Sequence, residues 1–391
     1  MDPAMSQDFY ARQLDDLAQR DLRRRLHQVD SAQDARIVRN GRQLICFSSN
    51  NYLGLANDPR LIAAAKAALD EFGLGSGASR LITGSMTPHH RLEEKLAHFK
   101  QCEAALTFAT GYQANLAAVS AGAARGDAIF SDALNHASII DAARLSRADV
   151  FVFPHKAYDA LESRLQRETQ FARRLIVTDT VFSVDGDLAD LPRLVELKTR
   201  YDAQLCIDEA HATGVFGPHG RGVAELQNVE DAIDITVGTL SKALGCAGGY
   251  VCGSRHLIDY LINRARSLIF STAPPPAIAA AACAALDLIV AEPDRRKTLL
   301  AHADRLRAEL GDRLGFNLGQ STSPIIPLIV GDSAAALDLS AQLLEHGLLV
   351  PAIRPPTVPE SSSRLRITPI AAHTEADLDA LISALETHQT A

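Results

Sequence analysis

Short apolar runs alternate with amphipathic stretches through the middle of this chain of 391 residues. Apolar positions recur at helical spacing in "PRLIAAAKAALDEF" and in "PHHRLEEKLAHFK", and the second stretch has a proline in its first turn, as many helices do. Runs such as "AALTFA", "RLIVTDT" and "QLCIDEA" are apolar without alternation. They predict strands that are buried on both faces, as in a parallel sheet covered by helices.

The pattern changes toward both ends of the chain. Near the N-terminus, "FYARQLDDLAQRDLRRRL" has helical periodicity with charges on one side, and "LICFSSNNYLGL" predicts a strand that ends in a polar turn. Near the C-terminus, two helical patterns flank "SPIIPLIVG", and "SRLRITPI" precedes a last helix. We therefore predict an N-terminal helix and strand segment over residues 1–55, a large α/β domain over 56–290 and a small C-terminal α+β domain over 291–391.

Composition and charge exclude several classes of protein. The formal net charge is -8, whereas a general nucleic-acid binder normally carries a basic patch. The six cysteines form no CxxC pair, so we expect neither a zinc site nor a disulfide framework, but a reducing, cytoplasmic location. "PPPAIAAAACAALDLIVAEP" is interrupted by Asp287, and a buried helix explains it better than a membrane span. We predict no metal, nucleic-acid or membrane partner.

Polar side chains follow the predicted strands directly. They end successive apolar runs, and the carboxyl ends of strands in an open α/β sheet meet at one edge, where ligands bind. One of them is a lysine, which almost never lies inside a protein unless its charge is compensated. Together they would supply a carboxylate, two imidazoles, an amine and a strand-to-helix corner whose N–H groups can bind an anion. The residues concerned are Asp208, His136, His211, Lys242, Gly111 and Tyr112.

Each of these residues alone has an ordinary explanation. A loop lysine is usually solvated, His136 could be a buried core histidine, and Gly111 could simply end a strand. Their order at successive strand ends favours a joint site instead. A confined lysine with a lowered pKa suits a Schiff base with an aldehyde cofactor such as pyridoxal 5'-phosphate. That cofactor also needs a carboxylate at its ring nitrogen, a flat group on its ring and an anion site for its phosphate.

Several motifs, taken in order, make the prediction more specific. "FSSNNYLGL", "FGLGSGASRLITG", "LNHASIIDAARLS", "FSVDGD", "DEAHATGVFG" and "TLSKALG" together resemble the α-oxoamine synthase family of pyridoxal phosphate enzymes, over roughly residues 20 to 385. The resemblance implies the fold type I of PLP-dependent transferases, with a large, mostly parallel sheet domain and a smaller C-terminal α+β domain. It also implies a homodimer with the cofactor near the subunit interface.

The resemblance implies a role for each residue around the cofactor. Lys242 would form the Schiff base and then remove the α proton of the substrate, Asp208 would pair with the ring nitrogen, and His136 would stack on the ring. His211 and Ser183 would lie near the phenolic oxygen. The phosphate would be held by Gly111, Tyr112 and Thr239, with Thr272 of the partner subunit as a weaker candidate.

A second set of residues is implied to contact the substrate. Arg354 would bind the amino-acid carboxylate through its forked guanidinium. Thr357 would lie beside the acyl chain, and Asn50, Arg23 and His136 would also contact substrate.

Two alternatives stay open within this set. Arg364 and Arg366 could bind the carboxylate instead of Arg354, since strand alternation puts both on one side. Arg23, with two arginine neighbours, could be only a solvated position on a helix face.

The segment "AIRPPTVPESSSRLRIT" bears on the substrates. Within the family it resembles the members that join L-alanine to a pimeloyl thioester in biotin biosynthesis, a decarboxylating C-acyltransferase reaction that releases CoA or the thiol of an acyl carrier protein. The alternatives are members of the 5-aminolevulinate synthase, 2-amino-3-ketobutyrate CoA ligase or serine palmitoyltransferase type, and a non-catalytic partner subunit, which would lack Lys242. A nucleotide-dependent enzyme, suggested by "DEAH", fails for want of a GxxxxGKS/T phosphate loop.

Overall fold

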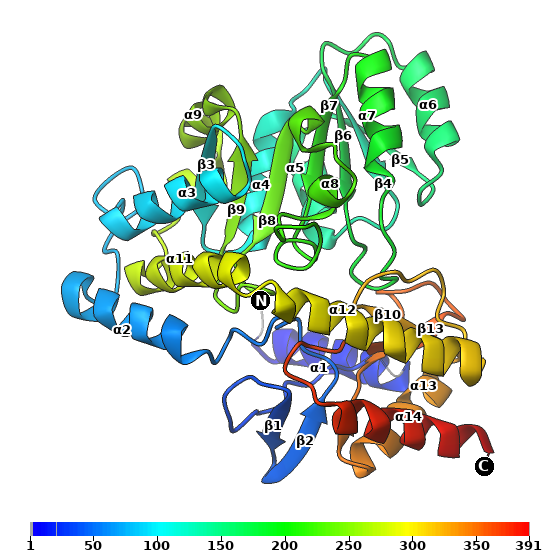
Figure 1. The fold of residues 1–391 in the computed structure, drawn as a ribbon. Coiled ribbons are helices and arrows are strands. Elements are labelled where there is room, and N and C mark those ends of the chain that lie inside the picture. Colours follow the sequence, from blue (N-terminus) through cyan, green and yellow to red (C-terminus); the bar gives the residue numbers. More distant parts are fainter. Residues whose placement is uncertain (1–2, 21, 391) are drawn as a thin grey trace.

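A seven-stranded sheet forms the centre of the large domain in the computed structural model, which describes residues 3–20 and 22–390 (Figure 1). The strand order is β3–β9–β8–β7–β6–β4–β5. All neighbouring strands are parallel except where β9 pairs with β3 and with β8. The structure confirms the mostly parallel sheet, with one strand reversed.

The strands of this sheet occupy the predicted apolar runs. All but β5 are almost wholly buried, which explains the lack of alternation in the sequence. The edge strand β5 has exposed positions, among them Val152. The strands are β3 (Ala104–Phe108), β4 (Ala128–Asp132), β5 (Asp149–Phe153), β6 (Arg174–Asp179), β7 (Gln204–Asp208), β8 (Ile235–Thr239) and β9 (Gly249–Gly253).

Helices cover both faces of the sheet, and each face has its own core. Alternate residues of β6 show this, because Ile176 packs in one hydrophobic cluster while Leu175 and Val177 pack in the other. The cluster of Ile176 includes residues of α3 (Thr87–Phe99), α6 (Tyr158–Arg167), α7 (Leu191–Arg200), α8 (Val223–Leu226) and α11 (Pro276–Ala291). The other includes residues of α4 (Gly111–Gly122), α5 (Ala137–Ser146), α9 (Arg255–Arg264) and α10 (Arg266–Ile269).

Two helices test the sequence predictions closely. α2 (Pro59–Phe72) matches the predicted stretch, and Asp58 caps it by accepting from the N–H of Arg60 at 3.0 Å. α11 is largely buried, as expected for the alanine-rich segment. Within residues 3–20 and 22–390, no single helix is long and apolar enough to cross a membrane. One pair of consecutive helices, Pro276–Ala291 and Asp294–Arg313, is long and apolar enough when taken together, but the two helices meet at an angle of 75°.

The small domain combines elements from both ends of the chain (Figure 1). One sheet has the order β10–β13–β12, and the other has the order β1–β2–β11, so the N-terminal strands share a sheet with a C-terminal strand. Three helices accompany these sheets: α12 (Asp294–Arg307), α13 (Ser333–Glu345) and α14 (Glu375–Thr390). The strands are β1 (Arg36–Arg39), β2 (Arg42–Cys46), β10 (Ile326–Gly331), β11 (Leu348–Leu349), β12 (Ala352–Ile353) and β13 (Ser363–Ile367).

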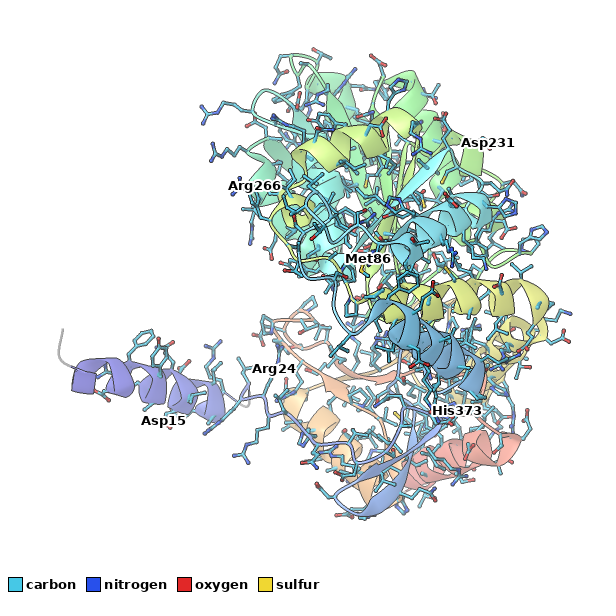
Figure 2. The ribbon with its side chains drawn as sticks, turned by 90° about the vertical axis from the view of Figure 1, so that its left-hand side faces the viewer. Asp15, Arg24, Met86, Asp231, Arg266 and His373 are labelled. Atoms are coloured by element: carbon cyan, nitrogen blue, oxygen red, sulfur yellow. The ribbon has the colours of Figure 1, made fainter. Side chains whose placement is uncertain are left out.

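The first helix ends earlier than the sequence pattern predicts. α1 (Pro3–Gln19) stops before the arginine run, where the N–H groups of Leu22 and Arg23 both donate to the carbonyl of Leu17. Figure 2 shows α1 extending away from the rest of the chain, with Arg24 where the chain reaches the small domain. Arg23 therefore does not lie on a helix face, but it is exposed to solvent, as that alternative expected.

Candidate active site

The carboxyl ends of the central strands enclose a cavity of about 250 Å³. Its walls come from the starts of α4 and α5 and from the turns after β6, β7 and β8. Seven of the eight residues predicted to surround a cofactor converge here from four separate segments of the chain, whereas Ser183 is not among the lining residues. The lining includes Gly111, Tyr112, His136, Asp208, His211, Thr239 and Lys242.

Lys242 lies in the loop after β8 and reaches into the cavity. The residue keeps some exposure, but surrounding protein atoms withdraw its amine from bulk water. This desolvation lowers the pKa of Lys242 to about 8, although the negative charge of Asp208 raises it. An amine with this pKa is partly neutral near neutral pH, so it can act as a nucleophile or a base.

Asp208 is a buried carboxylate at the end of β7. It accepts a hydrogen bond from Asn115 Nδ2 at 2.6 Å and another from the N–H of Ala210 at 2.8 Å. Among the described residues, no lysine, arginine or histidine nitrogen lies within 4.0 Å of it. A buried anion without a cation is costly, so this position suits a positively charged group on a ligand.

Asn115 is a site residue that the sequence analysis missed. It lies on α4, is buried, and donates to Ser138 Oγ at 2.9 Å as well as to Asp208. Its Oδ1 atom has no hydrogen-bond partner among the described residues. The available signal was an amide side chain inside the alanine-rich helix "GYQANLAAVSAG", where burial requires polar partners.

Asp179 stands beside Asp208 in the register of β6 and β7. It accepts from the N–H of His136 at 2.7 Å. Burial raises the pKa of Asp179 well above its ordinary value, and the neighbouring Asp208 adds to the effect. The pair therefore does not need to carry two negative charges.

His136 caps α5 and presents a flat ring to the cavity. Its Nδ1 accepts from the N–H of Ser138 at 3.3 Å, which places the proton of the neutral ring on Nε2. Partial desolvation lowers the pKa of His136, and the charge of Lys242 lowers it further, while Asp208 raises it. The residue is exposed, so a ring face is open to a planar ligand.

His211 is held by a second residue that the sequence analysis missed. Its Nδ1 lies 2.6 Å from the hydroxyl of Tyr52, and both side chains are buried. Burial lowers the pKa of His211 well below its ordinary value and raises the pKa of Tyr52. The neutral tyrosine therefore donates to Nδ1, and Nε2 of His211 keeps the proton that it can donate to a ligand.

One end of the cavity has the groups that an anion-binding site needs. Gly111 begins α4, and a Cβ placed on Gly249 would lie 2.5 Å from the Gly111 Cα, so the helix start approaches the sheet only because Gly249 has no side chain. Thr239 Oγ1 lies 2.8 Å from Ser241 Oγ, which adds hydroxyls to the free N–H groups of the helix. Helix N-termini of this kind bind phosphate.

Tyr112 stands at the same helix start and is half-exposed. Its hydroxyl donates to Asp141, and this bond raises the pKa of Tyr112. The aromatic ring therefore lines the cavity while its polar end is fixed by the carboxylate of α5.

The structure places the other predicted residues elsewhere. Arg354 and Thr357 line a separate groove of about 230 Å³, where Arg24 donates to Thr357 Oγ1 at 3.2 Å. Arg23 lines a neighbouring groove of about 920 Å³. Thr272 forms a β-bridge with Ser79 of its own chain.

Arg366 contacts two of the remaining predicted residues, Ser183 and Asn50. It is buried, and its guanidinium donates to the carbonyl of Ser183 at 2.7 Å, to Asn50 Oδ1 at 3.2 Å and to Thr368 Oγ1 at 3.0 Å. No ion pair joins it to a carboxylate in the described part of the chain. Its positive charge is close enough to lower the pKa of both Lys242 and His211, although Arg366 is not among the residues that line the cavity.

Arg364 differs from Arg366 although both lie on β13. Its guanidinium is buried and donates to Asp185 at 2.6 Å, so its charge is already compensated. Of the two alternatives for binding a carboxylate, only Arg366 keeps a charge that an incoming anion could balance.

The groups around the cavity fit pyridoxal phosphate. They include an amine of lowered pKa at Lys242, a buried carboxylate without a cation at Asp208, an open imidazole face at His136 and a helix start with hydroxyls. These are the four functions that the cofactor requires from a protein.

Comparisons with known proteins agree with this chemistry. The model of the aminotransferase class I and II family matches residues 42–385. Curated 8-amino-7-oxononanoate synthases from Geotalea daltonii and Lysinibacillus sphaericus are 49% and 47% identical over 379 residues, covering 96% and 97% of this chain and the same shares of those proteins.

Solved structures of similar proteins belong to the same group of enzymes. A structure of SPT with a PLP internal aldimine has a TM-score of 0.94 and 31% identity, covering 100% of this chain and 99% of that one. An 8-amino-7-oxononanoate synthase from Francisella tularensis has a TM-score of 0.77 and 28% identity, covering 89% of this chain and 98% of that one.

Proposed function

The chain belongs to the aminotransferase class I and II family, within its α-oxoamine synthase branch, and on that premise we propose that it has 8-amino-7-oxononanoate synthase activity. This reaction condenses L-alanine with a pimeloyl thioester, releases carbon dioxide and depends on pyridoxal 5'-phosphate. The observation that carries the proposal is an identity of 47–49% with curated enzymes of this name over almost the whole chain. The cavity around Lys242 supplies the matching chemistry.

The cofactor would be held by residues already in place around the cavity. Lys242 would bind its aldehyde covalently, Asp208 would face its ring nitrogen, His136 would lie against its ring, and the start of α4 would hold its phosphate. When bound, pyridoxal phosphate supplies a protonated ring that accepts the electron pair left at the substrate α-carbon.

Lys242 is also the base that we assign to the α proton of L-alanine. Its pKa of about 8 leaves a useful fraction of neutral amine near neutral pH, and a neutral amine can accept a proton. His211 donates from Nε2, because Tyr52 fixes its tautomer through Nδ1. The two residues therefore combine a proton acceptor and a proton donor within one cavity.

Arg366 is the residue that we assign to the carboxylate of L-alanine. Its buried guanidinium is held by neutral oxygen atoms, so an arriving carboxylate would balance its charge. Arg354, to which the family resemblance gives this role, lies with Thr357 and Arg24 in the separate groove. We assign that groove to the acyl thioester.

The two grooves suit an amphipathic and anionic thioester. Leu14, Leu17 and Val358 give the larger groove apolar walls that could cover the methylene chain of a pimeloyl group. Arg20, Arg23 and Arg24 lie on its lining and would attract the phosphates of CoA or of a carrier-protein arm.

We also propose that the active form is a homodimer. The bridge between Ser79 and Thr272 brings the loop of Leu81 and Ile82 beside Phe270, and all three apolar side chains are exposed. Association of two chains would bury this patch. The patch adjoins the cavity, because Gln113 of α4 reaches Ser271 at 3.4 Å, and the role of Thr272 of the partner subunit belongs to this proposal.

The proposed activity is tested by a matrix of substrates. The protein loaded with pyridoxal phosphate is incubated with alanine, glycine or serine against pimeloyl-, succinyl-, acetyl- and palmitoyl-CoA, and released thiol is measured. We expect alanine with pimeloyl-CoA to release thiol fastest, and Lys242→Ala to release none above background. Fastest release from serine with palmitoyl-CoA would instead support the activity named for the structural neighbours.

A further inference from the structure

His155 lies between two acidic side chains outside the cavity. It follows β5, with Nδ1 3.0 Å from Asp132 Oδ1 and Nε2 3.0 Å from Asp187 Oδ2. Both carboxylates are buried. Carboxylate oxygens only accept hydrogen bonds, so the ring satisfies both only as an imidazolium that carries a proton on each nitrogen.

The charges around His155 balance only when it is protonated. Lys156 Nζ donates to Asp187 Oδ2 at 2.9 Å, and the N–H of Lys156 donates to Asp132 Oδ2 at 2.9 Å. Burial raises the pKa of the neighbouring Tyr158 to about 12, so Tyr158 is neutral, and Asp190 and Asp179 are the next carboxyl groups around the cluster. Burial alone would lower the pKa of His155, but its bonds to Asp132 and Asp187 raise it to about 9.

The two carboxylates belong to segments that lead to the active site. Asp132 ends β4 and accepts from the N–H of Leu134 at 2.9 Å, inside the turn that leads to His136. Asp187 closes the loop of residues 182–188, where its carbonyl accepts from the N–H of Phe182 at 3.1 Å. The ring of His155 packs edge-on against Phe182, with centroids 4.3 Å apart.

The same loop holds the arginines of β13. The carbonyl of Ser183 accepts from Arg366 Nε at 2.7 Å, and Asp185 accepts from Arg364 at 2.6 Å. His155 therefore connects the turn that carries His136 to the loop that fixes Arg366, although its own side chain does not line the cavity.

We propose that the His155 imidazolium is a positioning residue for the amino-acid site, because it holds the loop of residues 182–188 against β4 and thereby keeps Arg366 directed at the substrate carboxylate. The inference rests on the proposed role of Arg366. It predicts a larger effect on amino-acid binding than on cofactor binding, because Lys242, Asp208 and the start of α4, which we assign to the cofactor, lie outside that loop.

The test compares His155→Gln with His256→Gln, a matched change at an exposed histidine of α9. L-Alanine binding to protein loaded with pyridoxal phosphate is measured by calorimetry, and cofactor content is measured separately. We expect His155→Gln to weaken alanine binding about tenfold, the scale of one hydrogen bond to a charged group, with full cofactor content. His256→Gln should bind like the parent.

The pH dependence tests the charge itself. The folded-state pKa of His155 is about 9, above its ordinary 6.5, so its stabilisation is complete below pH 6.5 and disappears as the pH rises through about 9. The difference in Tm between the parent and His155→Gln should therefore be largest at low pH and vanish above that range. His155→Arg, which keeps a cation at all these pH values, should retain alanine affinity.

Three results would overturn the inference. They are equal alanine affinity in the parent and His155→Gln, equal losses of alanine and cofactor binding, or a difference in Tm that does not change with pH. If His155→Gln does not fold, the proposal is rejected when a folded His155→Arg protein binds alanine weakly. A parent protein that binds no alanine would instead contradict the proposed function, and the Tm profile would still decide whether the charged bridge forms.

Discussion

The cofactor cavity and the acyl-side grooves differ in how their side chains are held. In the cavity, Asp208 at the end of β7 is fixed by Asn115 on α4, and His211 is fixed by Tyr52, a fully buried residue of the loop between β2 and α2. In the grooves, the exposed Arg24 reaches Thr357 on a loop. Chemistry that needs fixed geometry thus uses the rigid sheet, whereas substrate selection uses segments that can vary without disturbing it.

The largest expected effect comes from removing the amine of the cavity. Lys242→Ala should lower kcat by about 10³-fold or more, because it removes both the covalent attachment and the base. Pyridoxal phosphate should still bind, since Asp208 and the helix start remain. Borohydride reduction and peptide mass spectrometry of the parent protein should place the label on Lys242, with the exposed Lys66 unlabelled and Lys66→Ala fully active.

Replacing Asp208 and Asp179 by asparagine should lower kcat to different extents. Asp208→Asn removes the charge that would face the ring nitrogen, so we expect kcat to fall about 100-fold with little change in Tm. Asp179→Asn resembles the protonated acid that burial already favours at that position, so its effect should be several times smaller. Equal losses of kcat in the two variants would show that the cavity does not distinguish these carboxylates.

Variants of Arg366 and Arg354 test which arginine binds the carboxylate of alanine and which binds the thioester. Arg366→Ala should raise the KM for alanine about thirtyfold, as expected when a carboxylate loses a buried charged partner worth about 2 kcal/mol. Arg354→Ala should instead raise the KM for the thioester. Should Arg354→Ala raise the KM for alanine more than Arg366→Ala does, Arg354 would be the carboxylate ligand and the division proposed here would be wrong.

The smallest effect is on the pH dependence of cofactor capture. The folded-state pKa of Lys242 is about 8 rather than its ordinary 10.5, so the neutral amine becomes dominant above pH 8. Between pH 7 and 9 the rate of pyridoxal phosphate capture by cofactor-free protein should rise about tenfold and then level off. Stopped-flow absorbance measures this rate. A rate that keeps rising to pH 10 would indicate a lysine with an ordinary pKa.

The sequence predicted the strands and their functional ends because burial on both faces leaves a simple signal. The run "RLIVTDT" became β6, and Asp179 stands at its end. The reversed direction of β9 was not predictable, because an apolar run does not record strand direction. Asn115 and Tyr52 were missed, because a single polar group in an apolar stretch does not show which distant residue it binds.

The choice among the arginines shows another limit. Alternation along β13 placed Arg364 and Arg366 on one side, but it could not tell which charge is compensated. That depends on Asp185, which lies far away in the sequence. The helical pattern of the first segment likewise did not show that α1 ends at Gln19, before the arginine run.

The pairing of β2 with β11 has a consequence for synthesis. Ile45 emerges from the ribosome early, but its neighbour Leu348 is among the last residues to be made. The N-terminal strands must therefore wait, unpaired on one edge, until translation is nearly complete and the newly made end returns to them. A chaperone that shields this edge during elongation should improve the yield of folded chain, and a nascent chain cut before Leu348 should be its preferred client.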